Sequence, residues 1–131
     1  YAAAKMALVG ATRAIAQEGA RHNVRANVVA PMASTRMAGG VFGDLADALR
    51  PDLVSPVVAW LAHPSCTVTG EVLSAAGGRA ARAVTTVGRG LRATTPEALA
   101  ELWPALRDDE QVALEHALRE AHLVRAVLSQ P

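Results

Sequence analysis

The chain has 131 residues, of which 51% are hydrophobic and 19% are charged, so it carries enough apolar side chains to build a folded core. Its 13 basic and 12 acidic residues leave a net charge of +1, which favours neither a nucleic-acid-binding nor a membrane-binding class. The single cysteine excludes an internal disulfide, and no apolar run is long enough to span a bilayer. This composition is typical of a cytosolic globular protein, and we expect a cytoplasmic location.

The first element is expected to be a helix over Ala2–Gln17, because this stretch is rich in alanine and has no proline. The only tyrosine and the only lysine, Tyr1 and Lys5, open it four residues apart, on one face and one turn from each other. A lysine ammonium beside a phenol favours the phenolate, and such a phenol can exchange a proton with a substrate oxygen. The alternative is a pair of solvated residues on an exposed turn, since this spacing is common.

The helix is expected to end at Gly19 and to bury one apolar stripe. That stripe consists of Ala4, Leu8, Ala11 and Ile15. After a polar turn, apolar and polar residues alternate over Val24–Ala30, which predicts a strand that Pro31 ends.

Together, a helix with Y-x-x-x-K and an N-x-V-A-P strand resemble the short-chain dehydrogenase/reductases. The residues that carry this resemblance are Tyr1, Lys5, Asn27, Val29, Ala30 and Pro31. Further along, Thr35–Met37 and Leu49–Leu61 look like the (3R)-hydroxyacyl-CoA dehydrogenase branch of peroxisomal-type multifunctional enzymes. Val68–Gly78 resembles the last core strand of the family and its glycine-rich exit. The resemblance covers the chain from Tyr1 to Trp103.

The resemblance implies an α/β fold, namely the second half of a doubly wound parallel (Rossmann-type) sheet followed by a helical C-terminal extension. We expect residues 1–78 to form the dehydrogenase half-domain and residues 79–131 the extension. The chain has no G-x-G-x-x-G turn for a dinucleotide, and the family's catalytic serine precedes its tyrosine. We therefore expect the chain to be the second half of a longer enzyme and to be inactive alone.

By the same resemblance, the parent enzyme transfers hydride between NAD or NADP and a 3-hydroxy/3-oxo acyl thioester. Tyr1 is the expected acid/base, Lys5 supports it and holds the nicotinamide ribose, and the cofactor is also contacted by Pro31, Met32 and Thr35. The family's usual Pro-Gly is Pro31-Met32 here, and the missing glycine fits the hydroxyacyl-CoA branch. Thr35 comes one residue earlier than the family's threonine.

Other readings remain open. The enzyme could reduce an acyl-carrier-protein substrate or a small ketone, and the chain could instead be a non-catalytic oligomerising remnant. The family's homodimer contact implies a partner helix against the first helix, where small side chains permit close approach. Those side chains are Ala3, Ala7, Ala11 and Ala14. No metal is expected, because the histidines lack ligand spacing. They are His22, His63, His116 and His122.

In the extension, Ala83–Val87 fits an extra strand, and the glycines at 88 and 90 fit a turn. Thr95-Pro96-Glu97 predicts a helix start, with threonine as the cap and proline in the first turn. A second helix is expected to start at Asp108 or Asp109. Both tryptophans, Trp60 and Trp103, are expected in the core.

Overall fold

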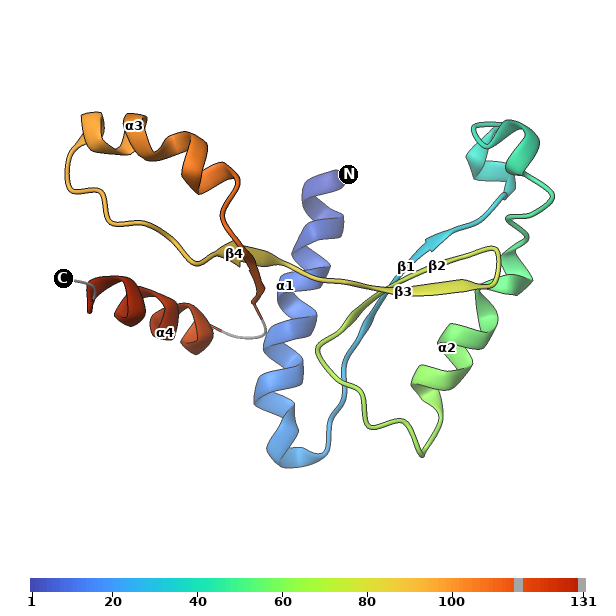
Figure 1. Ribbon diagram of the computed structural model, residues 1–131. Coiled ribbons are helices and arrows are strands. Elements are labelled where there is room, and N and C mark those ends of the chain that lie inside the picture. Colours follow the sequence, from blue (N-terminus) through green and yellow to red (C-terminus); the bar gives the residue numbers. More distant parts are fainter. Residues whose placement is uncertain (115–116, 130–131) are drawn as a thin grey trace. The chain divides into compact units, whose positions relative to one another are not determined.

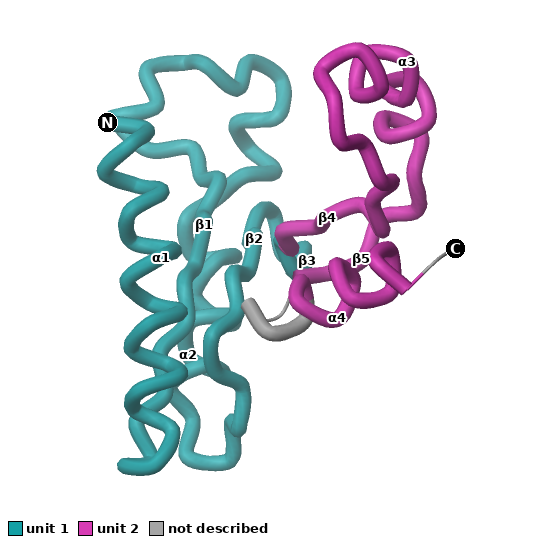
Figure 2. Tube along the Cα trace, turned by 90° about the vertical axis from the view of Figure 1, so that its left-hand side faces the viewer, with its two compact units in different colours: residues 1–83 teal, residues 84–131 magenta. Residues whose placement is uncertain are grey.

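The computed structural model describes residues 1–114 and 117–129. The chain divides into two compact units, Tyr1–Ala83 and Val84–Pro131 (Figure 2). The first unit contains four 3₁₀ turns, at Ala20–His22, Arg36–Ala38, Gly43–Leu45 and Pro51–Leu53. Its helices and strands are α1 (Ala2–Gly19), β1 (Val28–Met32), α2 (Ser55–Ala62), β2 (Val72–Ala76) and β3 (Arg79–Ala83) (Figure 1).

The sheet of the first unit has three strands in the order β1-β2-β3. β1 and β2 run parallel and are joined by a crossover that contains α2, whereas β2 and β3 form an antiparallel hairpin. The pairing of Ala76 with Arg79 leaves Gly77 and Gly78 as a two-residue turn, with φ angles of 54° and 81°. Positive φ at both positions is typical of a type I′ turn, which suits glycine. The parallel pair and its helices confirm the predicted α/β class.

Helix α1 forms where alanine content predicted it, but it buries a different face. Ala16 is 5% exposed, whereas Leu8 and Ile15 are 54% and 50% exposed, so the predicted apolar stripe is wrong. The reason is a close approach between small residues: a methyl group on Gly70 would lie 3.5 Å from Cβ of Ala16. Larger side chains would hold α1 away from this loop, so the packing selects Ala16.

Strand β1 begins and ends later than the predicted range, Val24–Ala30. The residues before β1 form hydrogen bonds with a loop rather than with a neighbouring strand. The Ala26 amide donates to Thr69 Oγ1 at 3.1 Å, and the Ala26 carbonyl accepts from the Gly70 amide at 2.7 Å. Regular pairing therefore starts only at residue 28.

Pro31 lies inside β1 and does not end it, in contrast to the prediction. The Val28 amide donates to the Glu71 carbonyl at 2.8 Å, so the amides of residues 28, 30 and 32 face β2. The nitrogen of Pro31 faces the opposite way, toward the edge of the described sheet, where no ladder bond is lost.

The first unit packs around a small apolar core. Its buried residues are Ala16, Leu49, Cys66, Val72, Leu73 and Ala75. The prediction that both tryptophans are core anchors is wrong for the described chain, since Trp60 is 49% exposed and Trp103 is 63% exposed.

The second unit contains β4 (Thr86–Gly88), α3 (Pro96–Arg107), β5 (Gln111–Ala113) and α4 (Ala117–Leu128). The predicted start of α3 is confirmed, because the Thr95 side chain accepts a hydrogen bond from the Ala98 amide at 3.1 Å. This bond satisfies one of the free amides of the first helical turn.

The helix predicted from Asp108 or Asp109 is not formed there. The chain turns back after α3 and pairs β5 with β4, placing Val112 opposite Val87. Asp109 stabilises this turn, because its Oδ2 accepts a hydrogen bond from the Gly90 amide at 2.7 Å. Gly88 belongs to β4, so only Gly90, with a φ of 88°, lies in the turn that was expected.

The strand predicted over Ala83–Val87 is two strands, since β3 ends at Ala83 and β4 begins at Thr86. Next to the β4–β5 pair, Arg89 Nε contacts Glu110 Oε2 at 2.6 Å. The hydrogen bond from Arg89 and its positive charge hold the pKa of Glu110 below its ordinary value.

Candidate active site at the start of α1

Tyr1 and Lys5 are the only predicted site residues that the structure joins by a described contact. Tyr1 precedes α1, and its carbonyl accepts the Lys5 amide at 3.0 Å, which makes the first helical bond. The Lys5 Nζ atom lies 5.3 Å from the centre of the Tyr1 ring. This distance is within the range of a cation–π contact. The helix therefore brings an ammonium and a phenol together, as the spacing predicted.

This pair faces solvent. Tyr1 is 96% exposed, and no carboxylate pairs with Lys5 in the described part of the chain. The ammonium thus keeps its three N–H donors for another molecule. The geometry therefore offers two functional groups. One is a phenol that can exchange a proton, and the other is a cation that can bind hydroxyl groups.

Pro31, Met32 and Thr35 lie at the carboxyl end of β1 and just beyond it. This end of β1 and the amino end of α1 lie at the same end of the first unit (Figures 1 and 2). Met32 is 50% exposed, and Thr35 is exposed and extended, with a φ of −129°. In the described chain, no hydrogen bond, ion pair or ring contact links these three residues to the Tyr1–Lys5 pair. They share only an end of the unit with it.

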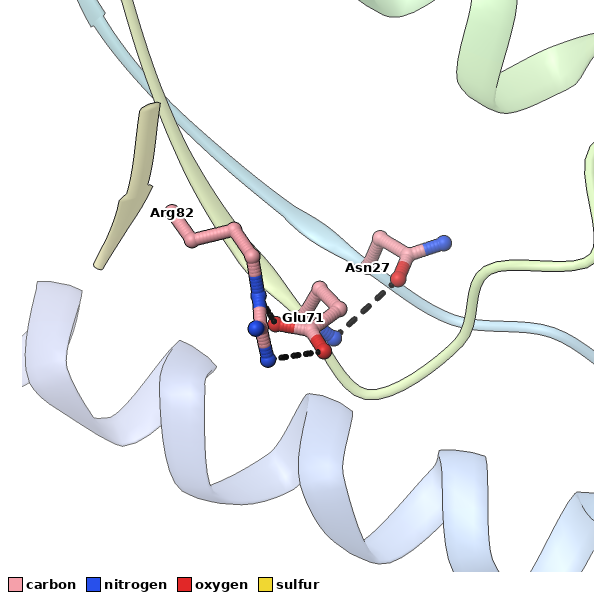
Figure 3. A network of polar contacts seen from close by, with 3 residues as sticks. All are labelled: Asn27, Glu71 and Arg82. Carbon is pink, nitrogen blue, oxygen red and sulfur yellow. Dashed lines mark hydrogen bonds and ion pairs between the residues drawn. The ribbon is translucent and has the colours of Figure 1, made fainter. Parts of the chain in front are cut away.

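A polar network at the other end of β1 includes residues that the sequence reasoning did not connect. Asn27 Nδ2 donates to the Val68 carbonyl at 2.9 Å, and Asn27 Oδ1 accepts the Glu71 amide at 3.1 Å. The Glu71 carboxylate in turn accepts two bonds from Arg82, at 3.0 and 2.7 Å (Figure 3).

The network fixes the register between β1 and β2. Pro31, Met32 and Thr35 lie at the other end of β1. Asn27 satisfies backbone groups of the loop before β2, and the Glu71–Arg82 pair ties that loop to β3. An amide among apolar neighbours at residue 27 was the available signal, but its partners lie 41 and 44 residues away. The alternation of apolar and polar residues over Val24–Ala30 predicts only that the Asn27 side chain faces outward.

The described histidines do not gather into a metal site. His63 Nδ1 lies 2.7 Å from Ser65 Oγ, and His116 lies outside the described residues. No cluster of three histidine, cysteine or acidic side chains suited to a metal occurs within residues 1–114 and 117–129. Over the same residues, no helix combines the length and apolarity needed to cross a membrane.

The fold matches solved structures of the short-chain dehydrogenase type. A solved short chain dehydrogenase from Mycobacterium avium superimposes with a TM-score of 0.61 and 32% identity, over 87% of this chain and 40% of that one. Full-length peroxisomal multifunctional enzyme type 2 from Drosophila melanogaster gives a TM-score of 0.77 and 33% identity, over 98% of this chain and 25% of that structure. No protein-family profile matches the chain.

The sequence comparison leads to the same relative. The chain is 38% identical to peroxisomal multifunctional enzyme type 2 of Drosophila melanogaster over 129 residues, which cover 92% of this chain and 22% of the enzyme. The predicted resemblance to the short-chain dehydrogenase/reductases, and to the multifunctional-enzyme branch, is confirmed. The chain spans about a fifth of that relative's length.

Proposed function

We propose that the protein containing this chain is an oxidoreductase that transfers hydride between NAD or NADP and a 3-hydroxy/3-oxo acyl thioester. The observation that carries the proposal is the Tyr1–Lys5 pair, with the Lys5 ammonium 5.3 Å from the phenol ring at the exposed start of α1. The resemblance of Thr35–Met37 and Leu49–Leu61 to the hydroxyacyl-CoA branch supports the choice of substrate class.

The residues have separate tasks in this proposal. The Tyr1 hydroxyl donates a proton to the substrate oxygen during reduction and accepts it during oxidation. The Lys5 ammonium lies beside the phenol ring and holds the ribose hydroxyls of the cofactor. Pro31, Met32 and Thr35 line the nicotinamide side of the site. When bound, the nicotinamide cofactor supplies the hydride chemistry, and the protein orients it.

The available groups fit one end of such a cofactor. Lys5 has donors free of any carboxylate in the described chain, which suits hydroxyl groups. The sequence has no glycine-rich turn of the dinucleotide type for the diphosphate. We therefore propose that these 131 residues alone show no turnover. Ketone reduction by the isolated chain above its own Tyr1→Phe control would refute that part.

The test of the catalytic roles uses the full-length protein. Tyr1→Phe should lower kcat by about 10²–10⁴-fold, the usual range for loss of a general acid or base, with cofactor affinity retained. Lys5→Ala should lower both kcat and cofactor affinity. Lys5→Arg should restore little, since a planar guanidinium does not replace a compact ammonium.

Steady-state rates with cofactor titration decide the outcome. If Lys5→Ala keeps the parent's cofactor affinity and pH–rate profile, the role proposed for Lys5 is wrong. Comparing an acyl-CoA, an acyl-carrier-protein thioester and a small ketone at equal concentrations tests the substrate class. If a folded full-length protein turns over none of the three substrates, the alternative hypothesis of a non-catalytic oligomerising protein is favoured.

We further propose a homodimer of the full-length protein through the alanine-rich face of α1. The supporting observation is that the small residues on this face are exposed in the first unit. They are Ala3, Ala7, Ala11 and Ala14. Sedimentation that shows a monomer at every accessible concentration would refute the dimer. We keep the cytoplasm as the proposed location, and fluorescence imaging of the tagged full-length protein tests it, with a peroxisomal pattern as the contradicting result.

A further inference from the structure

The segment from Ser34 to Leu49 is a loop whose two ends meet. The Ser34 amide donates to the Leu49 carbonyl at 2.7 Å, and Leu49 is 8% exposed. This loop leaves the carboxyl end of β1, on the side of the first unit that holds the start of α1 (Figure 2). Compact loops with close ends are frequent sites of function, since a rigid scaffold presents them to a ligand.

The body of the loop presents apolar side chains to solvent. Met37, Val41 and Leu45 are 98%, 81% and 63% exposed. The hydrogen bonds within the loop are local, as between the Ala38 amide and the Thr35 carbonyl at 2.9 Å. The position of these apolar side chains therefore depends on how the base of the loop is held.

The base of the loop rests against the β2–β3 turn. A methyl group on Gly77 would lie 2.9 Å from the Ala48 carbonyl oxygen and 3.6 Å from Leu49 Cδ2. The next turn residue is different, because a methyl group on Gly78 would meet no atom within 4 Å. Gly77 is thus the turn position at which lack of a side chain lets the loop backbone come close.

We propose that Gly77 is a positioning residue for the active site: its contact with Ala48 and Leu49 sets the position of the Ser34–Leu49 loop. This inference rests on the proposed function, in which Thr35 of this loop lines the nicotinamide side of the site. The apolar tip then covers the acyl chain of the substrate, and its placement controls substrate binding more than proton transfer at Tyr1.

The paired glycines supply a matched comparison. Asparagine tolerates positive φ, and Asn-Gly is a favoured pair in type I′ turns, so Gly77→Asn keeps the turn conformation. It also adds a Cβ atom at the position where Ala48 leaves no room. Gly78→Asn adds the same side chain at another positive φ, into open space.

The experiment compares both variants in the full-length protein. Hydrogen exchange of the Ser34 amide, which donates to Leu49, should speed up about tenfold in Gly77→Asn and stay near the parent's rate in Gly78→Asn, as expected for local opening. The KM for a 3-oxoacyl thioester should rise at least about tenfold only in Gly77→Asn, since small misplacements near a site are costly. Cofactor affinity should be kept in Gly78→Asn, the variant that leaves the loop, and Thr35 within it, in place.

Equal exchange rates in the two variants would overturn the contact, because turn strain alone would then explain any effect. Faster Ser34 exchange with unchanged KM would overturn the positioning role. If Gly77→Asn does not fold, Gly77→Ala against Gly78→Ala gives the same comparison with one methyl group. A parent without turnover refutes the proposed function, while the exchange measurement still judges the Gly77 contact separately.

Discussion

Replacing Asn27 with alanine should destabilise the first unit by about 2–3 kcal/mol. The side chain makes two hydrogen bonds to the loop before β2, one to the Val68 carbonyl at 2.9 Å and one from the Glu71 amide at 3.1 Å. Asn27 is half-buried, so water replaces only part of what is lost. Each of the two backbone groups that loses its partner therefore lowers the free energy of unfolding by about 1–1.5 kcal/mol.

The neighbouring ion pair provides the contrast. Glu71→Gln removes the charge that pairs with Arg82 but keeps the backbone amide that Asn27 binds. The two side chains are 28% and 59% exposed, and exposed pairs contribute about 0.2–1 kcal/mol. We therefore expect the neutral amide of Asn27 to matter more for stability than the charged pair beside it.

Urea unfolding followed by tryptophan fluorescence measures both variants. With a slope of about 2 kcal/mol per molar urea, Asn27→Ala should lower the midpoint by roughly 1 M and Glu71→Gln by less than ~0.5 M. A midpoint for Asn27→Ala equal to the parent's, or above that of Glu71→Gln, would refute the reasoning. It would mean that solvent satisfies the loop as well as Asn27 does.

Three further predictions concern single positions. Thr95→Ala should cost about 1 kcal/mol in thermal or urea unfolding, because it removes the α3 cap; a loss below ~0.3 kcal/mol would contradict the cap. The Arg89 hydrogen bond lowers the pKa of Glu110 below its ordinary 4.5. The pair therefore stabilises the fold above pH 4.5, and this stabilisation is lost as the pH falls through the pKa of Glu110 in the folded protein. NMR titration should show a Glu110 midpoint below 4.5 that rises in Arg89→Gln; an unchanged midpoint counts against the pair. Pro31→Ala should cost less than about 1 kcal/mol, and a clear gain in stability would show that residue 31 faces β2 after all.

The Tyr1–Lys5 pair shows how far local spacing reaches. Tyr1 and Lys5 are four residues apart in a sequence of strong helix formers, so their shared face follows from helix geometry. Their relation to Pro31, Met32 and Thr35 does not follow, because it depends on how α1 lies against β1. Among these five residues, the described ring contact and hydrogen bond join Tyr1 to Lys5.

The C-terminal part shows the opposite case. Residues after Asp108 carry apolar spacing that fits a helix, and α4 does form, but only from Ala117. Before it, Val112 pairs with Val87, a partner 25 positions earlier, and Asp109 binds the Gly90 amide. A periodic pattern cannot report such a partner, so a strand was read as a helix.

Features that depend on near neighbours follow directly from the sequence, namely helix α1 and the cap of α3, and the resemblance implied the α/β class. Tertiary structure alone decided which face α1 buries, where β1 begins, and how Asn27 reaches Val68 and Glu71. Helix propensity and capping act within a few residues, whereas the Asn27 contacts that set the strand register span 41 and 44 positions. The burial of Ala16 depends on Gly70, which lies 54 positions further along. For that reason Ala16 rather than Leu8 lies in the core, since only the fold brings Gly70 against it.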